Sequence, residues 1–259
     1  MKLLSMCGLI LVGTIHSLQA SKIDFREYCN ASFLEIGASY TRANINIEGE
    51  PSYDGNLGGI DGSYEYKSWN NFYGGLKLSW KQGTTTSSFA ERKLTYVDVQ
   101  ERIGYTCASF CKNWSATIFS GFGYRYLGHT LKLFEVPSIK FNYNEFYVPV
   151  GFLSDYFFFS CWSLGLNFTW MPQVYPTVEI VPLQGARWIL KNTMDNVLVE
   201  LPLTYSFTKN KCYSLILKPF YERWNDGRST AETFTGEELG LPKNSYNFYG
   251  VEFLFVFQF

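Results

Sequence analysis

The chain has 259 residues, with 22 Lys and Arg against 23 Asp and Glu, a formal net charge of -1 and a charged fraction of 17%. This balance excludes a nucleic-acid binder that depends on a strong basic field, and it excludes a charge-rich disordered chain. Hydrophobic residues make up 46% of the chain and aromatic residues 19%, so many side chains need a large apolar environment.

The first twenty residues have the features of a secretory signal peptide. Lys2 supplies the positive start, Leu9 to Ile15 form a short apolar run, and Leu18-Gln19-Ala20 is an acceptable cleavage site. The run is too short to cross a bilayer as a helix, and a buried N-terminal helix is the alternative. We therefore expect a signal peptide over 1–20 and an exported mature domain over 21–259.

The mature chain shows two-residue alternation of apolar and small polar residues in long segments. Apolar residues alternate with Ser163, Gly165 and Thr169 between Trp162 and Trp170, for example. Strands of soluble sandwiches are usually about five or six residues long, whereas these segments match the roughly 9 to 11 tilted residues that cross the hydrocarbon layer. Because lipid offers no hydrogen-bond partners to a free edge, the sheet must close. The sequence therefore predicts an all-β fold, a closed antiparallel transmembrane β-barrel.

The alternation predicts ten strands, and an even number suits a barrel of this type. In chain order they are 32–47, 60–69, 72–81, 92–107, 112–127, 139–153, 157–171, 194–208, 211–225 and 246–259. The segment 60–69 has the weakest pattern, so eight strands is the alternative. Short turns are expected at Asn70-Asn71, Ala108 to Cys111, Ser154 to Tyr156 and Lys209-Asn210, and long loops at 48–59, 82–91, 128–138, 172–193 and 226–245. Since barrels of this type place short turns in the periplasm, both chain ends are expected there.

Charged residues fall on the polar face of the predicted strands. The inward-facing set is Glu35, Lys77, Asp98, Arg102, Arg125, Glu145, Glu200, Lys218, Glu222 and Glu252. Glu101 is the exception, because it shares a face with apolar neighbours, which predicts a bulge, a shifted register or a rim position. Ten strands enclose a narrow lumen, so we expect either a filled interior of ion pairs or a narrow pathway for small solutes.

Five cysteines remain after removal of the signal peptide. Cys29, Cys107, Cys111, Cys161 and Cys212 all map to strand ends or turns on the predicted periplasmic side. The periplasm permits disulfides, and an odd number leaves at least one thiol free or linked to another chain. We hypothesise that Cys107 pairs with Cys111 and that others crosslink to neighbouring envelope proteins; unpaired small residues are the alternative. This cysteine usage is similar to that of the crosslinked envelope of the chlamydial major outer membrane porins, although no motif aligns.

The last strand carries a terminal pattern. Tyr249, Val251, Phe253, Phe255, Phe257 and the final Phe259 lie on one face. This resembles the C-terminal signature of Gram-negative outer-membrane β-barrel proteins, and the resemblance implies that these residues are a signal for the barrel-assembly machinery. It also implies the cell outer membrane as location, with outer-membrane lipid as a partner.

No catalytic, metal or cofactor motif stands out. Omptin proteases and the lipid A deacylase and palmitoyltransferase barrels use His with Asp or Ser at a rim, but the mature chain keeps only His129, predicted in an extracellular loop. A lone loop histidine is usually solvated surface, and Asp98 or Asp155 does not complete the omptin pattern. We expect no enzyme, no cofactor and no nucleic-acid partner. The predicted function is a structural outer-membrane barrel with narrow passive permeation; the alternative is surface adhesion through loops 172–193 and 226–245, and an omptin- or lipid A-modifying-type enzyme comes last.

Overall fold

A computed structural model of the chain describes residues 30–68, 71–88, 90–111, 113–132, 138–159, 161–181, 187–207, 212–229 and 240–259. The predicted signal peptide over 1–20 and Cys29 lie outside these residues. The strands are β1 (Asn30–Ile47), β2 (Tyr53–Ser68), β3 (Asn71–Thr86), β4 (Glu91–Cys111), β5 (Trp114–Lys132), β6 (Ile139–Tyr147), β7 (Val150–Phe159), β8 (Trp162–Trp170), β9 (Thr177–Val181), β10 (Arg187–Ile189), β11 (Val197–Glu200), β12 (Leu203–Ser206), β13 (Tyr213–Asp226) and β14 (Asn244–Gln258). Among the described residues, no helix is long and apolar enough to cross a membrane.

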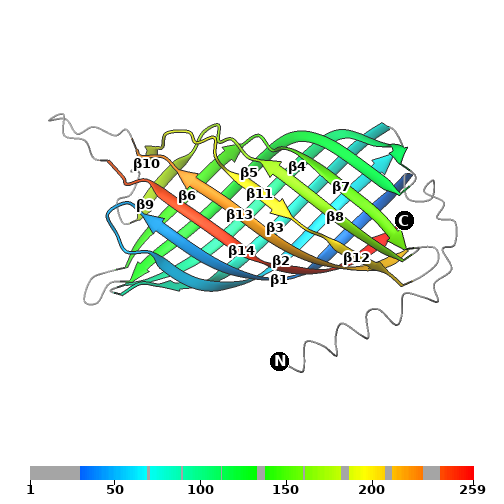
Figure 1. Ribbon diagram of the computed structural model, residues 1–259. Coiled ribbons are helices and arrows are strands. Elements are labelled where there is room, and N and C mark those ends of the chain that lie inside the picture. The colour runs from blue at the N-terminus through cyan, green and yellow to red at the C-terminus, as the bar shows by residue number, and fades with distance from the viewer. Residues whose placement is uncertain are drawn as a thin grey trace, which may run out of the picture.

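The fourteen strand segments form a closed antiparallel barrel of ten strands, two of which consist of two segments each, and β9 and β10 form an additional hairpin (Figure 1). Closure is made by β1, which pairs with β2 on one side and with β14 on the other, with Phe33 opposite Gln258. Two of the ten strands are interrupted at a proline, β6/β7 at Pro149 and β11/β12 at Pro202, because proline cannot donate a ladder hydrogen bond. The predicted ten-stranded barrel is confirmed, and the eight-stranded alternative is wrong.

Several predicted boundaries differ from the structure. The predicted loops 48–59 and 82–91 shrink, because β2 already begins at Tyr53 and β3 continues to Thr86. The predicted turn from Ser154 to Tyr156 is wrong, since β7 runs through it to Phe159. The predicted loop 172–193 contains the β9–β10 hairpin, which pairs with β6 and lengthens the barrel wall.

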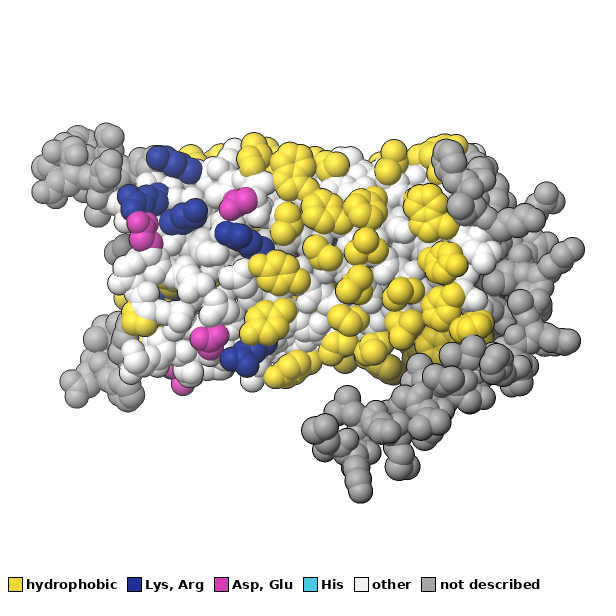
Figure 2. Space-filling model, in the orientation of Figure 1, with side chains coloured by type: hydrophobic (Ala, Val, Ile, Leu, Met, Phe, Trp, Pro, Cys, Tyr) yellow, Lys and Arg dark blue, Asp and Glu magenta, His cyan; other side chains and the backbone are white. Residues whose placement is uncertain are grey.

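The outer surface has two regions, which we name by their position along the strands. The terminal half contains the start of β1 and the end of β14, and the distal half contains the turn between β1 and β2. Along β1 the outward side chains are Leu34, Ile36, Ala38 and Tyr40 in the terminal half, then Arg42, Asn44 and Asn46 in the distal half. Figure 2 shows this division over the visible face, with a broad apolar band and charged side chains gathered at the other end. The band has the surface expected in lipid, and the distal wall has the surface expected in water.

The interior has the opposite polarity. Inward residues of β1 in the terminal half include Glu35, Ser39 and Thr41, whereas Ala43, Ile45 and Ile47 fill the distal half. The last three belong to a large buried apolar cluster with side chains from most strands, Tyr53, Leu94, Leu127, Tyr147, Trp224 and Phe248 among them. The distal half is therefore packed like a water-soluble barrel, while the terminal half has a polar lumen.

Candidate functional site

The ten predicted lumen charges all lie on the inner face of the barrel. Glu35 is half-buried and the other nine are buried, with Arg125 and Glu145 fully so. They do not form one cluster. Glu35, Lys77, Arg102, Glu200, Lys218 and Glu252 lie in the terminal half around a chamber. Asp98, Arg125 and Glu222 contact the distal apolar cluster, and Glu145 contacts Arg125.

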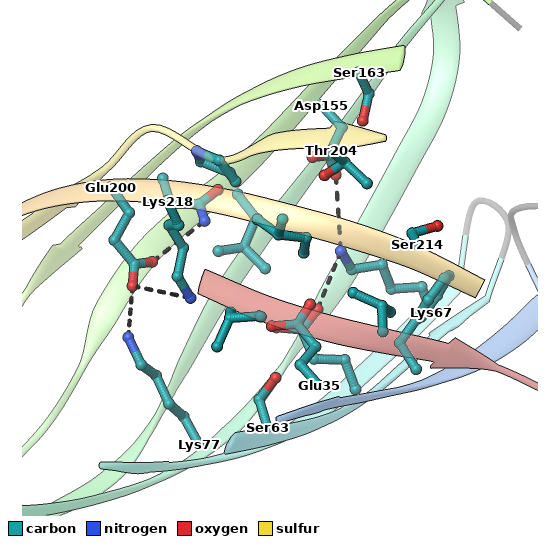
Figure 3. Close-up of a pocket in the computed structure, with 18 of the residues that line it drawn as sticks. Glu35, Ser63, Lys67, Lys77, Asp155, Ser163, Glu200, Thr204, Ser214 and Lys218 are labelled. Atoms are coloured by element: carbon teal, nitrogen blue, oxygen red, sulfur yellow. Dashed lines mark hydrogen bonds and ion pairs between the residues drawn. The ribbon is translucent and has the colours of Figure 1, made fainter. Parts of the chain in front are cut away.

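A chain of ion pairs crosses the lumen at the inner end of the chamber. The Lys77 ammonium on β3 lies 2.5 Å from a Glu200 carboxylate oxygen on β11, on the opposite wall. The same oxygen lies 3.6 Å from the Nζ of Lys218 (Figure 3). The Nζ of Lys218 is also 2.7 Å from a carboxylate oxygen of Glu252. Because each charge has an opposite charge beside it, this crossbar makes burial of the four groups tolerable and fixes the distance between the two walls.

A second ionic contact lies on the terminal side of the first. Lys67 on β2 is 3.1 Å from Glu65 and 3.7 Å from Asp155 on β7 (Figure 3). Sequence analysis missed these three residues as lumen groups. A signal was present, because Asp61, Glu65 and Lys67 alternate with outward Ile60, Tyr64 and Tyr66 in the segment whose strand pattern is weakest.

Between these contacts the lumen contains a chamber. The space between its lining residues that no atom fills, open solvent included, is about 1230 Å³, and it reaches Ser214 and Gln258 near the terminal end. Six carboxylates and four cationic side chains line it, together with the apolar side chains of Leu153, Ile216 and Leu254. The chamber thus combines charged groups with apolar wall, as small-molecule sites do.

The distal lumen is filled. The guanidinium of Arg125 lies 4.3 Å from the Trp224 ring and 3.5 Å from Glu145, and the Tyr147 and Trp224 rings pack edge to face at 5.1 Å. Tyr147 donates a hydrogen bond of 2.6 Å to Asp98. These contacts join opposite walls across the axis. The large chamber consequently ends on the terminal side of the apolar cluster.

His129 does not lie in a loop, so the predicted position is wrong. It is part of β5 and is fully buried, with its ring 5.3 Å from that of Tyr143 and 5.5 Å from that of Tyr246. Neither of its ring nitrogens has a hydrogen-bond partner among the described residues. Asp98 bonds Tyr147 and Gln100, and Asp155 lies in the terminal half against Lys67. Among the described residues, neither acid bonds the His129 ring, and the ring itself is closed to solvent.

The cysteines within the described residues lie near the terminal end. Cys107 and Cys161 are free thiols, half-buried, so the hypothesised disulfide between Cys107 and Cys111 is absent from this structure. The reason lies in the strand pairing, because β4 continues to Cys111 with a register shift between the two residues instead of turning. Cys212 is exposed just before β13.

Glu101 faces outward in the terminal half. It lies opposite Leu76 on β3 and Phe122 on β5, both exposed apolar residues. Pairing of β4 with β5 is continuous from Glu91 to Cys107, so the expected bulge or register shift at Glu101 is wrong. A carboxyl group is thus presented within the apolar band itself.

The predicted assembly residues share the outer face of β14. Tyr249, Phe253, Phe257 and Phe259 are exposed there, and Val251 and Phe255 are half-buried between neighbouring strands. Phe259 also donates and accepts backbone hydrogen bonds with Ser32 of β1, so the last residue takes part in closing the barrel.

Comparisons with known proteins relate the chain by fold to a solved outer-membrane protein. No protein-family model and no curated protein matches the sequence. The outer membrane protease OmpT from Escherichia coli is similar in structure, with a TM-score of 0.56 and 14% identity over 94% of this chain and 99% of that one. The translocator domain of the autotransporter NalP from Neisseria meningitidis gives a TM-score of 0.46 and 13% identity over 98% of this chain and 95% of that one. Ail, the attachment invasion locus protein of Yersinia pestis, gives a TM-score of 0.36 and 10% identity over 87% of this chain and 99% of that one. The chain therefore has the fold of OmpT, a ten-stranded closed barrel.

Proposed function

We propose that this protein is an integral outer-membrane barrel with a structural role and a lumen closed to passage. The apolar band around the terminal half and the closed sheet suit a lipid bilayer, because each of the ten barrel strands pairs with a neighbour on both sides. The similarity in fold to OmpT supports the outer membrane as its location. The packing of the distal lumen favours the structural role over permeation.

The observation that carries this proposal is the apolar cluster across the distal half. A channel needs a continuous polar path, but here Tyr147, Trp224 and Phe248 meet inside the barrel with neighbouring apolar side chains. Buried charges at the same level are held by protein groups, since Arg125 contacts Glu145 and Asp98 accepts from Tyr147. Moving a hydrated ion through this cluster would require unpacking of a close-packed core.

Single-channel recording in planar bilayers tests the closed lumen. We expect no stepwise current from the native protein, and a measurable current from the double variant Tyr147→Ala, Trp224→Ala if it keeps its heat-modifiable migration in gels. Phe253→Ala, on the outer face, is the matched control and should stay silent. Stepwise current from the native protein would overturn the proposal.

Location and orientation have a separate test. Asn46→Cys places a thiol on the outer face of the distal half, beyond the apolar band. A membrane-impermeant maleimide added to intact cells should label this variant and leave the native protein unlabelled, because Cys107, Cys161 and Cys212 lie at the terminal end. Labelling that requires broken cells would place the distal half on the inner side.

Surface binding is the second candidate function. The distal half extends past the apolar band as a rigid, packed barrel with a polar exterior, and a rigid scaffold is what binding loops need. If the loops bind a target, cells that display the protein should attach to a surface that carries this target. Shortening loop 226–245 should abolish the attachment, while the variant keeps its heat-modifiable migration in gels. Attachment that survives shortening of this loop and of 172–193 would remove the loops from this role.

Crosslinking through cysteines remains a proposal for the terminal end. Cys212 is exposed there, close to the end of the barrel that would face the periplasm. Native membranes should show higher-mass species on non-reducing gels that disappear on reduction and in Cys212→Ser. Identical migration with and without reductant would exclude such links.

We propose no catalytic role for His129. Its ring is enclosed by Tyr143 and Tyr246, so water and substrate do not reach it. The native protein and His129→Ala should turn over peptide and lipid A substrates at the same background rate. Activity of the native protein that is lost in His129→Ala would show a catalytic role for the histidine.

A further inference from the structure

Five buried polar atoms on three adjacent strands have no hydrogen-bond partner among the described residues. They are both carboxylate oxygens of Asp61 and the hydroxyl oxygens of Ser39, Ser63 and Ser79. Asp61 is 2% exposed. Burying a carboxylate without a hydrogen-bond partner or an opposite charge is costly, so the Asp61 carboxylate needs a partner that compensates for its burial.

The strand register brings these atoms to one place. Asp61 lies directly opposite Ser79 on β3 and opposite Gly37 on β1. Ser39 is the diagonal neighbour of Asp61, since it faces Gly59. Gly37 and Gly59 contribute no side chains, and neighbouring atoms pack closely against both, so the open side of the Asp61 carboxylate is the chamber. Asp61 and Ser63 line the chamber described above.

The cations around the chamber are engaged elsewhere. Lys77 and Lys218 form the crossbar with Glu200 and Glu252, and Lys67 contacts Glu65 and Asp155. Arg102 donates to Gln100 at 2.7 Å, and the Lys81 ammonium lies 4.3 Å from the Phe220 ring. Among the described residues, neither Asp61 nor Glu35 has an ion pair.

Glu35 is a second carboxylate on the same wall. It faces Ser63, which lies two residues from Asp61 on β2, so Glu35 and Asp61 are diagonal neighbours across β1 and β2, with backbone positions about 7–8 Å apart. Both line the chamber, whose wall also contains Ile216 and Leu254. Two unpaired carboxylates beside an apolar wall match a ligand with two positive groups joined by methylenes.

A metal ion fits this chemistry less well. The described residues contain no group of three or more His, Cys, Asp or Glu side chains that would hold one. Hard cations take six or more oxygen ligands or keep much of their water, whereas an alkylammonium group donates three hydrogen bonds, the number that a carboxylate with neighbouring hydroxyl groups can accept.

We propose that the chamber binds a linear aliphatic diamine or polyamine, with one ammonium group on Asp61 and the neighbouring serines and a second on Glu35. The methylene chain lies along Ile216 and Leu254. The ligand enters from the terminal end, because the apolar cluster fills the distal lumen.

Titration calorimetry of the folded, detergent-solubilised chain tests this site with 1,4-diaminobutane as the probe. We expect a dissociation constant below about 1 mM and binding at least about tenfold weaker for 1-aminobutane, which has one ammonium group. Asp61→Asn keeps the shape and removes the charge, and it should weaken diamine binding at least about tenfold. Glu35→Gln should bring the diamine close to the affinity of the monoamine.

Asp54→Asn is the matched control, since Asp54 lies on β2 but faces outward and accepts a hydrogen bond from Asn44. It should bind the diamine like the native chain. Heat-modifiable migration shows that each variant is folded. Absence of diamine binding to the native chain would mean that water alone meets these atoms and would overturn the proposal. So would unchanged affinity in Asp61→Asn, or calcium binding that is stronger than diamine binding and lost in the same variants. None of these outcomes depends on whether the barrel conducts.

Discussion

The terminal and distal halves of this barrel are built from the same strands with opposite polarity. In the terminal half the wall is apolar outside and charged inside, with ion pairs between Lys77, Glu200 and Lys218. In the distal half the wall is polar outside, and Trp224 with its neighbours fills the interior. The solvent outside each half accounts for the difference, because lipid leaves no gain in moving apolar groups inward, whereas water rewards it. Substitutions at matched positions measure how sharp this division is.

The largest effect is expected in the distal core. Trp224→Ala removes a fully buried ring that packs against Arg125 and Tyr147, so the free energy of unfolding should fall by about 3–5 kcal/mol. Phe253→Ala, on the apolar band, should cost only about 1 kcal/mol because lipid takes the place of the ring. Urea unfolding from liposomes measures both. Equal losses would contradict the idea that the two halves have different cores.

A new charge locates the border between the halves. Leu78 and Gln82 both face outward on β3, four residues apart. Leu78→Lys should destabilise the barrel by about 2–4 kcal/mol, and Gln82→Lys by about 0–1 kcal/mol, because only the first charge would lie in hydrocarbon. The same unfolding measurement applies. If the two substitutions lower the free energy of unfolding equally, the border of the apolar band does not lie between Leu78 and Gln82.

Glu101 breaks the pattern of the apolar band and offers a third test. Glu101→Leu should stabilise the protein by about 1–2 kcal/mol, since a carboxyl group next to Leu76 and Phe122 is costly in lipid. Glu91→Leu is the control, on the same strand but in the distal half opposite Lys132, and should bring no gain. Destabilisation by Glu101→Leu would indicate that the carboxyl group has a partner in the membrane.

The smallest effect concerns the distal turn. Arg228 donates a hydrogen bond of 2.9 Å to Glu48, and this contact lowers the pKa of the Glu48 carboxyl below its ordinary value. Because the pKa is lowered, the contact stabilises the fold fully at pH values above the ordinary carboxyl pKa. This stabilisation is lost as the pH falls through the lowered pKa. Arg228→Ala should raise the pKa of Glu48 towards its ordinary value, which NMR titration follows. Arg187→Ala, whose side chain bonds Thr177, should leave it unchanged.

Alternation alone was enough to predict the barrel, its ten strands and the inward direction of the charges. It was not enough for strand ends, because the prediction followed apolar residues on the outer face, and this pattern inverts beyond Tyr40 on β1 and on the other strands. Residues 53–59 and 82–86 were therefore assigned to loops. Asp61, Glu65 and Lys67 were overlooked for a related reason, since the glycine-rich β2 has a weak outward pattern.

The sequence by itself determined that the chain forms a closed β-barrel, because side-chain alternation is a local property of a strand and a lipid-facing sheet has no other way to satisfy its edges. Only the tertiary structure decided which charges meet, where the lumen closes and that His129 is enclosed by tyrosines. These contacts join residues that are far apart in the sequence and can lie on opposite walls of the barrel, as Lys77 and Glu200 do. Their partners are set by the register and tilt of the closed sheet, which no local pattern encodes.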